Sequence, residues 1–90
     1  MKIGDFKIRS STDEIVLYVL LEQNETMSYI EIGDYVELGD YHLEILDFHE
    51  SSHKIITKHL FETISPLPLS ALKKGTKITI TKKSKDVTRN

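Results

Sequence analysis

Apolar and charged residues alternate through most of residues 30–45, and Gly-Asp pairs interrupt the alternation. Strict alternation is typical of a β-strand with one buried face. Gly39-Asp40 separates two such runs, and glycine readily adopts the positive φ that a two-residue hairpin turn requires. We therefore predict a hairpin formed by residues 35–38 and 41–45, with residues 46–48 extending its second strand.

Five other segments have the composition of strands. They are residues 6–9, 14–22, 27–32, 53–64 and 77–81. The second is β-branched and aromatic without a polar break, which favours a central strand covered on both faces, although one helical turn inside the core has a similar composition. The fourth fits either one long strand or two bent halves. In the third we expect Ile30 and Ile32 on one face and Glu31 on the other.

Turn composition separates these segments. We expect turns or polar loops at residues 10–13, 23–26 and 49–52, and a bulge or sharp corner at Gly33-Asp34. The two prolines within residues 65–69 exclude regular helix and central strand there, because each removes a backbone donor. Residues 70–74 fit one helical turn with Ser70 as N-cap and Gly75 as its left-handed end.

This pattern predicts an all-β fold, a small and partly open β-barrel of six or seven strands with at most one short helical turn near residues 70–74. Closure is favoured because open strand edges promote aggregation. We expect a single domain over residues 1–81 and a basic, polar C-terminal tail over residues 82–90. The expected core comprises Phe6, Ile8, Ile15, Leu17, Val19, Leu21, Ile30, Ile32, Val36, Leu38, Leu43, Ile45, Ile55, Ile78 and Ile80.

A Gly-Asp-aromatic motif occurs three times, at residues 4–6, 33–35 and 39–41. We interpret the three sites as corners of the chain, because glycine permits backbone conformations that other residues avoid. A duplicated structural unit is the alternative interpretation.

Ninety residues suffice for one modest hydrophobic core. The absence of cysteine excludes disulfides, thiolate metal sites and cysteine nucleophiles. The first residues lack the apolar segment of a signal peptide, and the longest apolar run, residues 15–21, is far shorter than the ~20 residues of a membrane-spanning helix. We therefore expect a cytoplasmic protein that does not associate with membranes.

The net charge of −2 conceals a segregation of charge along the chain. Residues 10–53 contain eleven acidic residues and no Lys or Arg, whereas residues 54–90 contain nine basic and two acidic residues. Two arrangements account for this. Either acidic and basic strands lie side by side and pair across the sheet, which we favour, or the basic residues form a binding face.

If such a face exists, its candidate binding residues are Lys54, Lys58, Lys73, Lys74, Lys77, Lys82 and Lys83. Small barrels bind single-stranded nucleic acid through basic grooves and aromatic side chains, so RNA or another single strand is the alternative partner. The aromatic residues fall mainly in the acidic half, however, and only Phe61 lies within the basic segment. A protein partner or a homo-oligomer is therefore our first expectation.

Residues 49–53 match the His-Glu-x-x-His pattern of zinc proteases. That chemistry requires a helix, so that both histidines face one metal and the glutamate acts as base, together with a third protein ligand. The segment follows a strand pattern, and Ser51-Ser52 favours a loop. We expect a polar hairpin loop and neither metal nor other cofactor, with His49 and His53 as the remaining candidates for metal ligation.

Other catalytic arrangements are also missing. No Gly-x-Ser-x-Gly motif indicates a serine nucleophile. Glu37 and Glu44 can face each other across the predicted hairpin, but no pocket-sized domain surrounds them. We therefore expect no enzymatic activity, and our primary hypothesis is a non-catalytic interaction module.

The segment Ile30-Glu31-Ile32-Gly33-Asp34-Tyr35-Val36-Glu37-Leu38 resembles the first hairpin of the β-barrel second domain of translational GTPases of the elongation factor Tu type. Strands of that domain also meet through an apolar-x-x-Gly-Asp-x-Val pattern. Residues 72–78 occupy the place of the turn that leads to its closing strand, with Thr76 where the family often has an acid. The resemblance spans residues 14–81 and implies a barrel and a binding role. Because the chain has no phosphate-binding loop, it implies no nucleotide hydrolysis.

Overall fold

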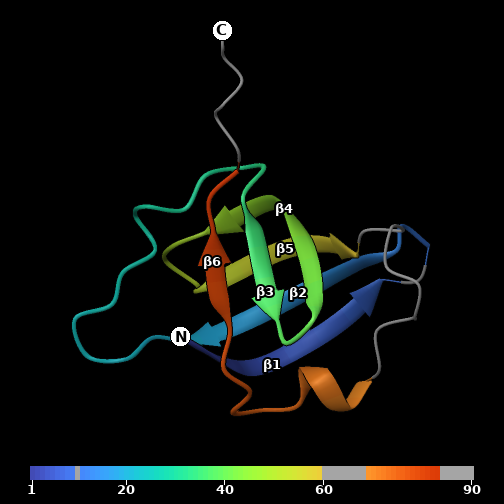
Figure 1. Ribbon diagram of the computed structural model, residues 1–90, viewed down its shortest axis with the longest axis horizontal. Helices are drawn as coiled ribbons and strands as arrows, with labels where there is room; N and C mark the ends of the chain where they lie inside the picture. Colours follow the sequence, from blue (N-terminus) through green and yellow to red (C-terminus); the bar gives the residue numbers. More distant parts are fainter. Residues whose placement is uncertain (10, 60–68, 84–90) are drawn as a thin grey trace, which may run out of the picture.

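Six antiparallel strands form one curved sheet that wraps into a partly open barrel in the computed structural model, which describes residues 1–9, 11–59 and 69–83 (Figure 1). The elements are β1 (Lys2–Arg9), β2 (Glu14–Leu20), β3 (Tyr35–Leu38), β4 (Tyr41–His49), β5 (Lys54–His59), the 3-10 turn η1 (Leu69–Leu72) and β6 (Thr79–Thr81). The strand order is β1-β2-β5-β4-β3-β6. This confirms the predicted all-β fold class.

The two outer strands of the sheet meet at one end only. The backbone N–H of Ile3 donates to the carbonyl of Thr76 at 2.9 Å, and the N–H of Ile78 donates to the carbonyl of Met1 at 3.0 Å. Lys2 and Lys77 form an isolated bridge between these bonds. Beyond Ile78 this pairing stops, so β1 and β6 close the barrel only in part.

The predicted central hairpin is confirmed. β3 and β4 pair with Leu38 opposite Tyr41, and Gly39 adopts a φ of 63° in the turn between them. β4 continues past a bulge between Ile45 and Asp47 and ends at His49. The predicted extension of this strand is therefore confirmed as well.

One predicted strand, residues 27–32, is wrong. The segment consists of turns, in which Ile30 N–H donates to the Met27 carbonyl and Asp34 N–H donates to the Glu31 carbonyl. Ile30 is buried, whereas Ile32 is 57% exposed. Because no described strand lies beside this segment, its backbone groups bond locally and its side chains lose the two-residue period.

Smaller corrections concern the ends of elements. β1 begins at Lys2 and not at residue 6, because a bulge at Gly4 allows the strand to continue. The 3-10 turn begins at Leu69, so Ser70 lies inside it and not at the predicted N-cap. Gly75 does adopt the expected positive φ, at 91°. Residues 60–68 and 84–90, which include the second half of the predicted strand 53–64, the prolines and most of the predicted tail, lie outside the described residues.

The core largely follows the predicted positions. Ten of them are buried: Ile15, Leu17, Val19, Ile30, Val36, Leu38, Leu43, Ile45, Ile55 and Ile78. Phe6, Leu21 and Ile80 are partly buried against that cluster. Ile8 and Ile32 were wrongly assigned to it and are exposed. Sequence reasoning missed Met1, Ile3, Met27 and Leu72, which lie in segments without clear alternation.

An approximate twofold axis relates the two halves of the barrel. Four residues lie directly opposite one another across adjacent strands: Phe6 on β1, Leu17 on β2, Ile55 on β5 and Phe48 on β4. A rotation about the middle of this row exchanges β1 with β4 and β2 with β5. It also superposes the β1 bulge before Asp5 on the β4 bulge before Asp47.

The same rotation exchanges β3 with the segment that leads into β6. Gly33 and Gly75 both have positive φ, at 98° and 91°. Gly33 N–H donates to the carbonyl of Ile45 at 2.9 Å, and Gly75 N–H donates to the carbonyl of Ile3 at 2.7 Å. The structural counterpart of the Gly33 corner is therefore Gly75, while Gly4 of the predicted motif lies at a bulge.

Candidate functional site

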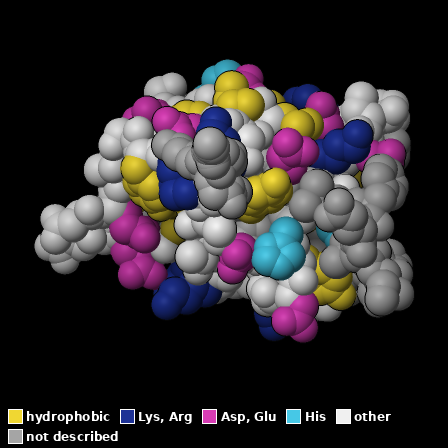
Figure 2. Space-filling model, turned by 45° about the horizontal axis from the view of Figure 1, so that its top comes forward, with side chains coloured by type: hydrophobic (Ala, Val, Ile, Leu, Met, Phe, Trp, Pro, Cys, Tyr) yellow, Lys and Arg dark blue, Asp and Glu magenta, His cyan; other side chains and the backbone are white. Residues whose placement is uncertain are grey.

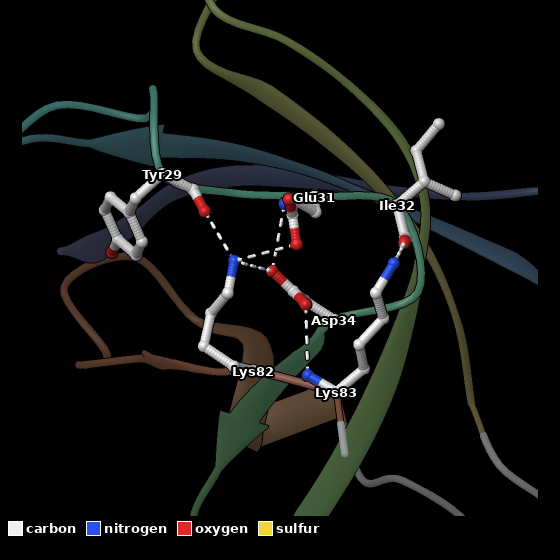
Figure 3. Close-up of polar contacts among 6 residues, drawn as sticks. All are labelled: Tyr29, Glu31, Ile32, Asp34, Lys82 and Lys83. Atoms are coloured by element: carbon white, nitrogen blue, oxygen red, sulfur yellow. Dashed lines mark hydrogen bonds and ion pairs between the residues drawn. The ribbon is translucent and has the colours of Figure 1, made fainter. Parts of the chain in front are cut away.

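The side chain of Asp34 is fully buried next to the end of β6, and its carboxylate accepts three hydrogen bonds (Figure 3). Its Oδ2 atom accepts hydrogen bonds from Lys82 Nζ at 2.6 Å and from the Glu31 backbone N–H at 2.9 Å. Its Oδ1 atom accepts from the Lys83 backbone N–H at 3.1 Å. One carboxylate thus joins the end of β6 to the loop before β3.

The ionised form of this carboxylate is favoured. Burial raises the pKa of Asp34, but the hydrogen bond from Lys82 and those from the backbone N–H groups of Lys83 and Glu31 outweigh it, so the pKa lies below its ordinary value. The hydrogen bond to Asp34 raises the pKa of Lys82. The two groups are therefore a charged pair near neutral pH.

Lys82 and Lys83 also donate hydrogen bonds to backbone carbonyls of the loop before β3. Lys82 Nζ donates to the Tyr29 carbonyl at 2.5 Å, and Lys83 Nζ donates to the Ile32 carbonyl at 3.0 Å. A Cβ atom at Gly33 would lie 3.2 Å from Lys83 Cδ, so glycine leaves room for this side chain. The first two residues assigned to the predicted tail, Lys82 and Lys83, are thus fixed to the loop before β3.

On two strand edges, an aspartate carboxylate caps the backbone N–H that follows a bulge. The bulges direct the N–H groups of Phe6 on β1 and Phe48 on β4 away from the sheet, and each donates at 2.8 Å to the carboxylate of the preceding aspartate, Asp5 or Asp47. Bulges and charged residues at an edge oppose the addition of another strand. These two edges are therefore unsuited to pairing with a partner at this point.

The outer edge of β6 has no such capped N–H. Ile78 N–H points toward β1, and alternate residues of a strand point the same way, so Ile80 N–H and C=O face the outer side as well. Within the described part of the chain no backbone group or side chain bonds to them, and β6 has no bulge. Ile80 itself is half-buried and packs against the core.

The seven candidate lysines do not form one basic face. Lys54 and Lys58 lie on β5, and Lys82 and Lys83 bind the loop at Asp34. Lys77 lies in the bridge to β1, and Lys73 and Lys74 follow the 3-10 turn. The structure brings together only Lys82 and Lys83 around one described group.

Pairing across the sheet places basic residues beside acidic ones in one row of the described strands. Arg9, Glu14, Lys58 and Glu44 lie opposite one another in a row across β1, β2, β5 and β4, so that the charges alternate in sign. Arg9 Nη1 lies 3.2 Å from Glu14 Oε1. Figure 2 shows basic and acidic side chains interspersed on the face that it presents.

The histidine motif does not form a helix. His49 ends β4, residues 50–53 form a turn, and His53 has a positive φ of 54°. His49 Nε2 lies 3.7 Å from Asp47 Oδ2. Within the described ranges, no group of three or more His, Asp or Glu side chains is arranged to hold a metal ion.

Sequence reasoning placed the candidate site on the basic residues and missed both the β6 edge and the role of Asp34. The Gly33-Asp34 corner was recognisable, but its partners Lys82 and Lys83 are distant in the sequence. The alternation of residues 77–81 indicated a last strand without indicating which of its sides is unpaired.

The fold and the unpaired edge define the chain as a small, partly open β-barrel. Comparison with protein-family models, with curated proteins and with solved structures finds no match. The resemblance to the second domain of translational GTPases therefore stays a prediction. No helix in the described segments is long and apolar enough to cross a bilayer.

Proposed function

We propose that this barrel is a non-catalytic interaction module that binds an extended segment of a partner protein at the outer edge of β6. The observation that supports the proposal is the outward-facing amide and carbonyl of Ile80, which have no partner among the described residues. Extended segments join such edges through backbone hydrogen bonds, and side chains of alternate residues supply specificity.

The contrast with the other edges strengthens the proposal. The first outward amides after the bulges of β1 and β4 are occupied by Asp5 and Asp47, whereas that of Ile80 is not. Strand addition is thus opposed next to the bulges of β1 and β4, whereas β6 carries neither a bulge nor a cap.

The edge is short, so we expect weak and reversible binding. Each added backbone hydrogen bond contributes about 1 kcal/mol net. Side-chain burial next to Ile80 must therefore supply much of the affinity.

Nucleic-acid binding has less support. Lys58 and Lys82 both lie next to carboxylates, which neutralise the charge that phosphates would require. Tyr29 is 49% exposed and lies 6.0 Å from Lys82 Nζ, so one aromatic residue and one basic residue do meet. That lysine is already bonded to Asp34.

A library of extended peptides displayed on phage tests the proposal. We expect selection on the wild-type protein to enrich peptides that also bind Ile8→Pro but not Ile80→Pro. Proline removes the outward N–H in both variants, and Ile8 supplies the matched change on the β1 edge. Circular dichroism and thermal melting establish that both variants are folded.

A second measurement on the wild-type protein avoids dependence on the variants. Binding of an enriched peptide should slow hydrogen exchange at the Ile80 amide more than at the Thr79 amide, which already faces β3. Absence of any enriched peptide, or equal binding to Ile80→Pro, would overturn the proposal. A dimer that the Ile80→Pro substitution abolishes identifies a second copy of the chain as the partner.

A further inference from the structure

The ammonium group of Lys82 lies among a backbone carbonyl, two carboxylates and an aromatic ring (Figure 3). Its Nζ atom donates to the Tyr29 carbonyl at 2.5 Å and to Asp34 Oδ2 at 2.6 Å, and Glu31 Oε1 lies 3.6 Å away. The ring centroid of Tyr29 lies 6.0 Å from the same nitrogen. Carbonyl and carboxylate oxygens accept the N–H donors of an ammonium group, and an aromatic ring attracts its charge.

The barrel holds these acceptors in place through contacts that do not involve β6. Gly33 N–H donates to the Ile45 carbonyl at 2.9 Å, and Ile45 N–H donates to the Asp34 carbonyl at 2.8 Å. Glu31 N–H donates to Asp34 Oδ2 at 2.9 Å, which orients the carboxylate. Ile30 anchors the same segment in the core. The acceptors therefore keep their positions when the end of β6 leaves.

The ligand, in contrast, comes from a segment distant in the sequence and is reached by solvent. The side chain of Lys82 is 43% exposed, whereas that of Asp34 is 0% exposed. A buried carboxylate that loses its counter-charge is strongly unfavourable, because neither water nor another cation then compensates it. An empty site would therefore favour any cation that fits it.

From these contacts we propose that residues 29–34 form a binding site for primary ammonium groups, which we call the ammonium site, and that Lys82 occupies it as a ligand supplied by the chain itself. When Lys82 is removed or displaced, the ammonium site accepts a primary amine from outside. The proposal does not depend on strand addition at β6.

The short contacts make the ammonium site selective for primary amines. Two acceptors lie within 2.6 Å of the nitrogen, so both require an N–H donor pointing at them. A methyl group on the nitrogen would occupy the space of those hydrogen bonds. A quaternary ammonium has the same charge but no donor, so we expect it to be rejected.

Chemical rescue tests the proposal. Lys82→Ala removes every side-chain atom beyond Cβ, and n-propylammonium has the same atoms. We expect n-propylammonium chloride, titrated at constant ionic strength, to raise the melting temperature of Lys82→Ala in a saturable way. The rise should be about 2 °C when the amine concentration equals the dissociation constant. Circular dichroism detects this stabilisation whether the variant is fully or partly folded before the amine is added.

Three controls isolate the ammonium site. Propyltrimethylammonium carries the same charge without a donor and should leave Lys82→Ala unchanged. Lys73→Ala changes an exposed lysine and keeps Lys82 in place, so it should not respond to n-propylammonium. The double variant Lys82→Ala/Asp34→Asn lacks the carboxylate and should not respond either. Absence of rescue, or equal rescue by the quaternary amine or in the double variant, would overturn the proposal.

A mixture of two variants distinguishes a small amine from a lysine of a second copy of the chain. Lys82→Ala keeps the carboxylate and lacks the lysine, whereas Asp34→Asn keeps the lysine and lacks the carboxylate. A dimer that light scattering detects in the mixture, and in neither variant alone, identifies Lys82 of a second copy as a ligand. Rescue by n-propylammonium without such a dimer restricts the ligand to amines from outside this chain.

Discussion

The two halves of the barrel share a corner glycine, a bulge and an aspartate that caps the following aromatic amide, yet only one half is closed. The β3–β4 half continues through the turn at Gly39, whereas the β6–β1 half stops pairing at Ile78 and Met1. The outer edge of β6 is where we propose that a partner strand binds.

The corners themselves also differ. Asp34 follows Gly33 and collects hydrogen bonds from Lys82 and Lys83, while the counterpart of Asp34 is Thr76, which takes part through its backbone. Both corners are held by backbone bonds to the neighbouring strand, and the Asp34 corner has the contacts of its charged side chain in addition. Matched substitutions in the two halves separate the stability that both halves share from the stability that the charged contacts of one corner contribute.

The largest expected effect comes from the buried residues that precede the two corners. Ile30 is 3% exposed and its counterpart Leu72 is 0% exposed. Truncation to alanine removes buried methyl groups and leaves a cavity, so Ile30→Ala and Leu72→Ala should each lower the free energy of unfolding by about 3 kcal/mol. Leu69→Ala, at a position 61% exposed, is the control and should change it little. Urea denaturation measures all three, and a large loss in only one half would break the equivalence.

A smaller effect is expected at the charged corner. Asp34→Asn removes the charge that Lys82 and two backbone amides bind, so we expect a loss of about 2 kcal/mol at pH 7. Asp40→Asn, at an exposed turn position, should be neutral. Because the pKa of Asp34 is lowered in the folded state, its stabilising contribution is present above the ordinary Asp pKa of about 4 and is lost as the pH falls through the lowered value.

The difference in unfolding free energy between wild type and Asp34→Asn should therefore depend on pH in a defined way. The difference in unfolding free energy should be constant above about pH 5 and should shrink at lower pH as Asp34 becomes protonated. A difference that persists unchanged at pH 2 would show that the charge of Asp34 is not what stabilises the corner.

The smallest effect is expected at the capped edges. Asp5→Ala and Asp47→Ala each remove one exposed side-chain acceptor from a backbone amide, so each should cost about 1 kcal/mol or less in chemical denaturation. The same variants free a strand edge, and we expect light scattering to detect more association than in the wild type at high concentration. If only one of the two variants associates, the caps are not equivalent.

The elements predicted correctly from the sequence are those whose determinants are local. The β3–β4 hairpin follows from alternation and from Gly39, and both survive in the structure. The segment containing Ile32 was wrongly predicted as a strand, because its residues alternate although no described strand lies beside them. Pairing depends on topology, and the period of a single segment does not reveal it.

The candidate site could be predicted less well from the sequence for the same reason. The lysines were visible as a basic run, but only the fold places Lys58 between Glu14 and Glu44 and Lys82 against Asp34. The unpaired side of β6 depends on where the Met1–Ile78 bond ends. No composition or spacing within one segment carries that information.

The aspartate caps have a consequence for assembly. Among the described residues, the edges of β1 and β4 are capped next to their bulges, whereas β6 has neither a bulge nor a cap. A subunit with a single adhesive side completes its bonding after one encounter, whereas a subunit with two polymerises into a filament. If strand addition is confined to β6, as we propose, the barrel forms finite complexes and does not extend into fibres.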